Sequence, residues 1–384
     1  MPFQSLFDFN FPTRLIHGPG AIGRLPELFG QNQKVLIVTD KGLVANGLVG
    51  RVEAVLDQAE IGRATFDGVR GNPVPANVAA GNRLYQKEKC SAILAVGGGS
   101  PIDVAKMIGV LASNGGRIGD YLGAGKVQRD IPPLVCVPTT YGTGSEVTPF
   151  AVLNNPKTKN KDPVISWKIA PQVGVLDPEL SVGLPAWLGA ATGMDALTHA
   201  LESYINLLAT PITEGIALTA IELIGANIHR ACANDYELEA TDQMLQASML
   251  AGIAFAQTRL GNVHAMSHPV GAHFDVHHGT ANAILLPYVM DFNLPSRIDK
   301  FAAVATALGA DTQSLDQREA AQLAVDTLRQ FNRDLGIAEK LGQVGVKRSG
   351  INALAKATMQ SGNVTVNPRK TSIEDIHALF SEAI

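Results

Sequence analysis

The spacing of apolar residues changes near Leu184 and Pro185, and this change limits the folds that the chain can adopt. Before it, short apolar runs rich in β-branched residues alternate with segments of helical periodicity. After it, helical periodicity continues with almost no strand signal. Apolar strands separated by helices are typical of a parallel sheet covered on both faces, and helices alone are typical of a second, all-helical unit. We therefore predict an α/β domain with a parallel sheet over residues 1–183 and an all-α domain over residues 184–384.

The predicted elements of the first half are short and regularly spaced. Strands are expected over residues 34–40, 63–67, 92–97, 133–139, 148–153 and 173–177, and helices over 42–59, 74–89 and 100–112. In the second half, helices are expected over residues 185–206, 213–233, 238–257, 280–291, 297–308, 317–332, 350–359 and 373–383. The cleft between two such domains is a favoured place for a ligand.

Length and composition narrow the class of protein. The 384 residues exceed what one hydrophobic core usually supports. A net charge of -4 gives no electrostatic reason to bind nucleic acid or an anionic membrane, and no apolar run approaches the ~18 residues that span a bilayer. The N-terminus lacks a secretory signal pattern. Three widely spaced cysteines without a CxxC pair favour a reducing compartment and argue against cysteine metal ligands, so we expect a cytoplasmic protein.

A glycine loop, residues 97–100, follows a predicted strand and opens a helix. Glycines there let backbone N–H groups approach a phosphate, and the helix N-terminus adds partial positive charge. Pro101 and Asp103 suit the start of a helix. The sequence therefore predicts a phosphate-binding loop, although a simple strand-to-helix turn would use the same residues.

A second stretch, Gly18 to Gly23, spells G-x-G-x-x-G, and Asp40 lies 20 residues after Gly20. This spacing is that of a dinucleotide-binding fingerprint. The preceding run, residues 14–17, is short and is not a convincing buried strand. We therefore interpret this stretch as a turn followed by the start of a helix.

Asp40 stands at the end of a predicted strand, where a carboxylate can bind the adenosine ribose. Its charge would repel a 2′-phosphate and so favour NAD over NADP. An N-cap for the helix that follows is an equally good interpretation. Further along, the hydroxyl-rich loop, residues 139–146, suits ribose and phosphate oxygens, although its Ser and Thr residues could also be turn formers.

Histidines concentrate in one part of the second half. Five of the nine fall within fifteen residues: His264, His268, His273, His277 and His278. Elsewhere, Asp195 and His199 stand four residues apart and so share one helix face. Because their neighbours are apolar and small, these groups are expected to be buried, and a shared cation would offset the cost of burying them. Three histidines and one carboxylate suit Fe²⁺, Zn²⁺, Co²⁺ or Ni²⁺.

Together these motifs resemble the iron-containing (group III) alcohol dehydrogenase family, in particular its lactaldehyde reductase and propanediol dehydrogenase types. The resemblance runs over essentially the whole chain and is carried by FDGVRGNP, GGGSPIDVAK, PTTYGTGSEVT, LDPEL, GMDALTHALE, GNVHAMSHPVGA and HGTANAILLP. It implies an N-terminal Rossmann-like domain, a C-terminal helical domain and an active site in the cleft between them. It also implies that the glycine loop at Gly97 is the phosphate loop.

The resemblance also implies roles for individual residues. The metal ligands would be Asp195, His199, His264 and His278, and His268 would be a catalytic residue that moves protons. The cofactor-binding residues would be Asp40, Asn72, Gly98, Gly99, Ser100, Asp103, Thr139, Thr140, Ser145 and Lys161. Two positions depart from the family pattern: His277 replaces a frequent proline and could compete as a ligand, and His273 replaces a frequent aromatic residue and could face the substrate.

The implied activity is hydride transfer between a small primary alcohol or diol and NAD, with the alcohol oxygen bound to Fe²⁺ or a similar metal, in a homodimer or larger homo-oligomer. One alternative is a maleylacetate-type reductase, which a scarcity of basic residues around the site disfavours because an anion needs Arg or Lys. Another is a non-redox, metal-dependent lyase or hydrolase of the same architecture, which would form no NADH.

Overall fold

The computed structural model describes residues 7–30, 32–155, 160–233 and 236–384. Its N-terminal half is built on a six-stranded parallel sheet with the order β1-β9-β6-β4-β2-β3. These strands are β1 (Arg14–His17), β2 (Val35–Asp40), β3 (Arg63–Val69), β4 (Ala92–Gly97), β6 (Leu134–Pro138) and β9 (Val173–Leu176). The helices that flank them are α1 (Lys41–Ala45), α2 (Leu48–Gln58), α3 (Pro75–Lys87) and α4 (Gly99–Asn114). The predicted α/β class with a parallel sheet is confirmed.

The strand order reverses between β2 and β4. From β2 the chain moves outward to β3, then returns to place β4 on the other side of β2. In open α/β sheets, ligands bind at the carboxyl ends of the strands where the order reverses. Gly97 at the end of β4 is paired with Pro138 at the end of β6, so the glycine loop and the hydroxyl-rich loop leave the sheet side by side.

Two predicted elements differ from the observed ones. The helix expected over residues 42–59 is two helices, α1 and α2, because Gly47 adopts a φ of 83° that a continuing helix cannot contain. The strand expected over residues 148–153 is β7 (Phe150–Asn155), which lies outside the main sheet. It pairs antiparallel with β8 (Asn160–Ile165), and β8 pairs with β5 (Gly123–Ala124) in a small three-stranded sheet.

The stretch from Gly18 to Gly23 is a turn that leads into a 3-10 helix, Ala21–Leu28. The backbone N–H groups of Gly20 and Ile22 donate to the two carboxylate oxygens of Asp177, over 3.2 and 3.1 Å. These donors are therefore already bonded within the protein. This agrees with the interpretation of the stretch as a turn and the start of a helix.

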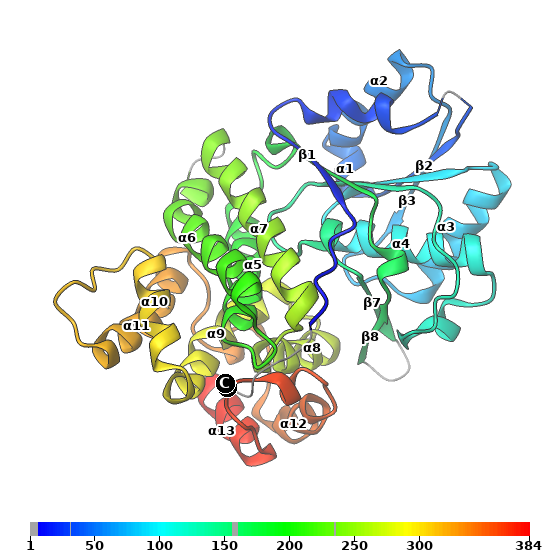
Figure 1. Ribbon diagram of the computed structural model, residues 1–384. Coiled ribbons are helices and arrows are strands. Elements are labelled where there is room, and N and C mark those ends of the chain that lie inside the picture. The colour runs from blue at the N-terminus through cyan, green and yellow to red at the C-terminus, as the bar shows by residue number, and fades with distance from the viewer. Residues whose placement is uncertain (1–6, 31, 156–159, 234–235) are drawn as a thin grey trace.

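The C-terminal half is helical, as predicted, and Figure 1 shows it from green to red beside the sheet region. Its α-helices are α5 (Ala186–Ile205), α6 (Pro211–Ala233), α7 (Leu238–Thr258), α8 (Asn262–Phe274), α9 (His278–Asn293), α10 (Ile298–Ala307), α11 (Gln317–Asp334), α12 (Ile351–Met359) and α13 (Ile373–Ala383). Helix α5 packs against α6, α7 and α9 and is buried from Gly189 to Ile205, so it forms the centre of this core. Among the described residues, no helix is long and apolar enough to cross a membrane.

Candidate active site

A cavity of about 1750 Å³ opens at the carboxyl ends of the strands and extends to the helical half. Every residue that the sequence analysis assigned to the metal, the cofactor or catalysis borders this cavity. These residues are Asp40, Asn72, Gly98, Gly99, Ser100, Asp103, Thr139, Thr140, Ser145, Lys161, Asp195, His199, His264, His268 and His278. The fold therefore brings together residues from both halves of the chain around one cavity.

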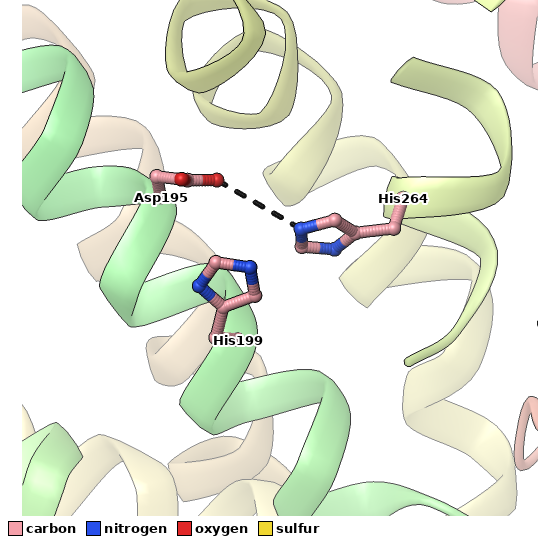
Figure 2. Close-up of side chains that lie close together, drawn as sticks. All are labelled: Asp195, His199 and His264. Atoms are coloured by element: carbon pink, nitrogen blue, oxygen red, sulfur yellow. Dashed lines mark ion pairs between the residues drawn. The ribbon is translucent and has the colours of Figure 1, made fainter. Parts of the chain in front are cut away.

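Four polar side chains converge at one end of the cavity. Asp195 and His199 extend from one face of α5 toward His264 of α8, and Figure 2 shows these three side chains turned toward one another. Each offers a ligand atom, and these atoms lie within 4.8 Å of one another. His278, the first residue of α9, places its Nε2 atom 3.8 Å from Oδ1 of Asp195.

Hydrogen bonds fix the orientation of two of the imidazoles. Nδ1 of His199 lies 3.2 Å from the carbonyl oxygen of Gly142, and Nδ1 of His264 lies 2.7 Å from a carboxylate oxygen of Glu202. A carbonyl or carboxylate oxygen accepts, so each Nδ1 atom carries the hydrogen, and in the neutral form of such an imidazole Nε2 is the nitrogen with the free lone pair. Burial also lowers the pKa of His264 well below the usual range of histidine, so this imidazole is neutral at physiological pH. A neutral imidazole with a free nitrogen is the form that binds metals.

The hydrogen bonds around Asn282 test whether a cation fits this cluster. Its Nδ2 atom lies 2.6 Å from Oδ1 of Asp195, 3.0 Å from Nε2 of His264 and 3.2 Å from Nε2 of His278. An amide nitrogen carries only two hydrogens, so it cannot satisfy three acceptors at once. Converging lone pairs that are buried and only partly satisfied fit a cation, because buried polar atoms otherwise find partners. The donor set therefore fits a divalent metal ion.

Gly279 allows α9 to approach α5 closely enough to place His278. A Cβ atom at this position would lie 2.2 Å from the carbonyl oxygen of Ala191. We expect Gly279→Ala to lower the free energy of unfolding by about 1–3 kcal/mol, because the two helices must separate to relieve the clash. Denaturant unfolding of the metal-free protein measures this. Gly215→Ala in α6 is the matched control, because a Cβ there meets no atom within 4 Å, and equal destabilisation by both substitutions would contradict the expectation.

The remaining histidines of the cluster have different positions. His268 borders the cavity, with its ring centre 5.3 Å from that of His278 and 6.0 Å from that of His264. His277 also borders the cavity, but its ring packs edge-on against Trp187. His273 is exposed and does not border the cavity, because five residues along a helix place it far around from His268. This position gives no support to the expectation that His273 faces the substrate.

The glycine loop and the hydroxyl-rich loop are in direct contact. A Cβ atom at Gly98 would lie 3.0 Å from Oγ1 of Thr140, and one at Gly99 would lie 2.7 Å from Cγ2 of Thr143. Larger residues at 98 or 99 would push the two loops apart. Close packing of these loops therefore explains the glycines independently of any need to admit a phosphate.

Asp103 and Ser145 hold the hydroxyl-rich loop against α4. The Ser145 hydroxyl donates to Oδ1 of Asp103 over 2.7 Å, and the Val152 N–H donates to Oδ2 over 2.9 Å. Fully buried Lys106, one turn after Asp103, donates to the carbonyl oxygens of Ser145 and Phe150 over 2.6 and 2.7 Å. Sequence reasoning missed Lys106, although a lone lysine in an otherwise apolar helix was a visible signal.

The other proposed cofactor residues also have partners within the protein. Oδ1 of Asp40 accepts the N–H of Leu43 over 3.0 Å, so Asp40 is the N-cap of α1 and still borders the cavity. Asn72 donates to Oδ1 of Asp275 over 2.9 Å and thereby links the loop after β3 to the end of α8. The Ser100 hydroxyl donates to the carbonyl oxygen of Gly71 over 3.0 Å.

The rest of the cavity wall contains both basic and aromatic side chains. Four basic residues border it: Lys41, Arg70, Lys161 and Arg259. The expected scarcity of basic residues therefore does not hold for the cavity as a whole. Beside the cluster of Asp195 and the histidines the wall is aromatic: Phe255 stacks on His199 with ring centres 4.5 Å apart, and Phe150 stacks on Phe255 with ring centres 5.9 Å apart.

Comparison with known proteins identifies the family. Residues 12–178 match the family described as iron-containing alcohol dehydrogenase, and residues 189–384 match the C-terminal part of the Fe-containing alcohol dehydrogenase family. The chain is 43% identical over 383 residues to 1,3-propanediol dehydrogenase of Citrobacter freundii, covering 98% of this chain and 99% of that protein. It is 38% identical over 379 residues to NAD-dependent methanol dehydrogenase of Bacillus methanolicus, covering 98% and 100%.

A solved structure agrees with these matches. The crystal structure of a 1,3-propanediol oxidoreductase superposes with a TM-score of 0.96 at 42% identity, over 99% of this chain and 100% of that one. Sequence and fold therefore agree over the full length, and the predicted resemblance is confirmed. This chain belongs to the iron-containing alcohol dehydrogenase family of oxidoreductases.

Proposed function

We propose that this enzyme transfers hydride between a small primary alcohol or diol and NAD, at a divalent metal held by Asp195, His199, His264 and His278. The observation that carries the proposal is the convergence of one carboxylate with imidazole nitrogens that are free to bind a cation, in the same cavity as the glycine loop. The names of the reported relatives, a propanediol dehydrogenase and a methanol dehydrogenase, support a short alcohol as the substrate.

The protein groups around this centre have distinct tasks. A divalent ion bound there supplies Lewis-acid chemistry, which stabilises negative charge on an alcohol or carbonyl oxygen. Phe150 and Phe255 cover the ligand His199 and exclude water from that side. The packed glycine and hydroxyl-rich loops offer N–H and hydroxyl groups to a dinucleotide and orient it toward the metal ligands, and such orientation can contribute ~7–11 kcal/mol to the rate.

NAD is proposed over NADP because Asp40 places a carboxylate at the end of β2, on the wall of the cavity. The name of the methanol dehydrogenase relative, which is called NAD-dependent, supports this preference. Fe²⁺ is proposed as the metal from the family, and Zn²⁺, Co²⁺ or Ni²⁺ would suit the same ligands. We further propose domains over residues 1–183 and 184–384, a cytoplasmic location and a homodimeric or larger assembly.

The proposal is tested by measuring NADH formation with anaerobically purified protein, metal-free and loaded with Fe²⁺, Zn²⁺, Co²⁺ or Ni²⁺, on a panel of short primary alcohols and diols. We expect metal-dependent turnover with NAD and much less with NADP. The panel includes hydroxy acids, because the basic residues of the cavity wall could bind an anionic substrate. Absence of turnover with every metal and with both cofactors would reject the dehydrogenase proposal. The non-redox lyase or hydrolase alternative would then take its place.

His268 is proposed to move the proton released from the alcohol, because it borders the cavity beside His264 and His278. We expect His268→Gln to lower kcat by about 10²-fold, which is typical of losing a general acid–base group, while the metal content stays at the wild-type level. Steady-state kinetics and metal analysis of the same preparation measure both quantities. His273→Gln is the control, because exposed His273 lies off the cavity, and we expect it to leave kcat and the substrate profile unchanged.

A further inference from the structure

Glu202 is a buried carboxylate that the proposed chemistry does not use. It lies on α5, three residues after His199 and seven after Asp195, so the three acidic and imidazole side chains share one helix face. Its side chain is only 1% exposed. An unpaired carboxylate in such a place would be strongly destabilising, so its partners indicate what it does there.

Both oxygens of Glu202 bind α8 at its first turn. One accepts Nδ1–H of His264 over 2.7 Å, and the other accepts the backbone N–H of Val263 over 2.6 Å. Burial raises the pKa of Glu202 to about 7, and hydrogen bonds from the backbone of Gly261 and Val263 oppose this rise. The N-cap residue Gly261 has no side chain to cap the helix, so Glu202 supplies the missing acceptor from another helix.

The Glu202 carboxylate packs tightly against the first turn of α8. A Cβ atom at Gly261 would lie 2.9 Å from a Glu202 carboxylate oxygen, so the turn before α8 closes directly over this carboxylate, and a side chain at 261 would displace it. The His264 side chain is also only 1% exposed, which leaves it little freedom to rotate. With Nδ1 engaged, the one nitrogen that His264 can present to the cavity is Nε2, which lies 3.8 Å from Oδ1 of Asp195.

We propose that Glu202 is a positioning residue of the metal centre: it holds His264 in the tautomer and orientation that offer Nε2 to the cation, and so sets how tightly the cation is bound. The proposal rests on the proposed function, because it takes His264 as a ligand. One helix thus carries two ligands and also orients a third ligand on a neighbouring helix. Carboxylates that bind the far nitrogen of a metal-ligating histidine typically change metal affinity by about 10–100-fold.

Glu202→Gln tests this role with little change in size. A glutamine amide presents one acceptor and one donor, so it cannot accept from both Val263 N–H and His264 Nδ1–H. We expect the dissociation constant for Zn²⁺, measured by competition with a chromophoric chelator, to rise about 10–100-fold. In the metal-free protein, we expect ¹⁵N NMR of the histidine side chains to show the Nδ1–H tautomer of His264 in wild type and its partial or full conversion to Nε2–H in the variant.

Matched variants separate positioning from general stability. Ser203 is buried beside Glu202 and bonds Oγ1 of Thr258 over 2.9 Å, so Ser203→Ala perturbs the same helix without touching His264, and we expect it to leave Zn²⁺ affinity unchanged. If the glutamine variant does not fold, Glu202→Asp replaces it. We expect Glu202→Asp also to bind Zn²⁺ more weakly than wild type, because the shorter side chain cannot reach both Val263 N–H and His264 Nδ1–H. Wild-type affinity and an unchanged His264 tautomer in a folded Glu202 variant would overturn the proposal.

His264→Ala distinguishes this proposal from the one on which it rests. If His264→Ala binds Zn²⁺ as tightly as wild type, the assigned ligand set is wrong and the role of Glu202 is wrong with it. If His264→Ala loses the metal while folded Glu202→Gln keeps wild-type affinity, the ligand set stands and only the role of Glu202 is rejected.

Discussion

Asp195→Ala is expected to remove both the metal and the activity. Asp195 is the only carboxylate in the group of ligand atoms that lie within 4.8 Å of one another among the described residues, so the variant leaves only neutral imidazoles to hold a dication. Without the Lewis acid, several kcal/mol of charge stabilisation is lost, and since about 1.4 kcal/mol corresponds to tenfold in rate, kcat/KM is expected to fall about 10³-fold or more.

Metal analysis after purification and NADH-formation kinetics measure this result together. Asp326→Ala on the exposed face of α11 is the control: it also removes a carboxylate, there one that pairs with Arg329, and it is expected to keep full metal content and activity. Circular dichroism checks that the Asp195 variant is folded. A folded Asp195→Ala protein that retains metal and wild-type activity would refute the role given to this residue.

Asp40→Asn is expected to raise the preference for NADP relative to NAD by about 10–100-fold, measured as the ratio of the two kcat/KM values. Like charges brought together across a binding interface typically cost several kcal/mol, and partial exposure of Asp40 to solvent reduces this repulsion to about 1–3 kcal/mol. Removing the charge removes that penalty for the 2′-phosphate, while NAD loses a hydrogen bond to its ribose.

The choice of asparagine separates the two interpretations of Asp40. Asparagine is as good an N-cap as aspartate, so the bond to the Leu43 N–H that begins α1 is kept and only the charge is lost. Asp40→Ala loses both the charge and the hydrogen bond to the Leu43 N–H, and we expect it also to lower the free energy of unfolding by about 1 kcal/mol. If Asp40→Asn leaves the NADP to NAD ratio unchanged, the carboxylate is a helix cap alone.

The sheet was predictable because its central strands are buried on both faces. Residues 35–39, 92–97 and 134–138 are fully buried, so these strands appear in the sequence as unbroken apolar runs. The small sheet was missed because β8 contains Lys161, Asp162 and Pro163, which interrupt any strand pattern. The break between α1 and α2 depends on the conformation of Gly47, and an isolated glycine within a helical pattern does not by itself end a helix.

The candidate site, like the fold, was predictable from the sequence only in part. The shared helix face of the proposed ligands Asp195 and His199 follows from their four-residue spacing. Glu202 and Asn282 were missed because the partner of each lies on another helix, 62 or 87 residues away along the chain. Seven residues from Asp195 to Glu202 and four from His278 to Asn282 placed them on the right faces, but only tertiary packing reveals what they touch.

The contact between His199 and the carbonyl oxygen of Gly142 has a thermodynamic consequence. Gly142 belongs to the loop proposed to receive the dinucleotide, whereas His199 belongs to the ligand cluster, so one 3.2 Å contact joins the two sites. If bound dinucleotide shifts this loop, the shift acts on His199 and so changes the free energy of binding the cation. Linkage then requires reciprocity: the factor by which bound metal changes the affinity for dinucleotide equals the factor by which bound dinucleotide changes the affinity for metal. In that case the enzyme would retain its metal more or less firmly according to the supply of its cofactor.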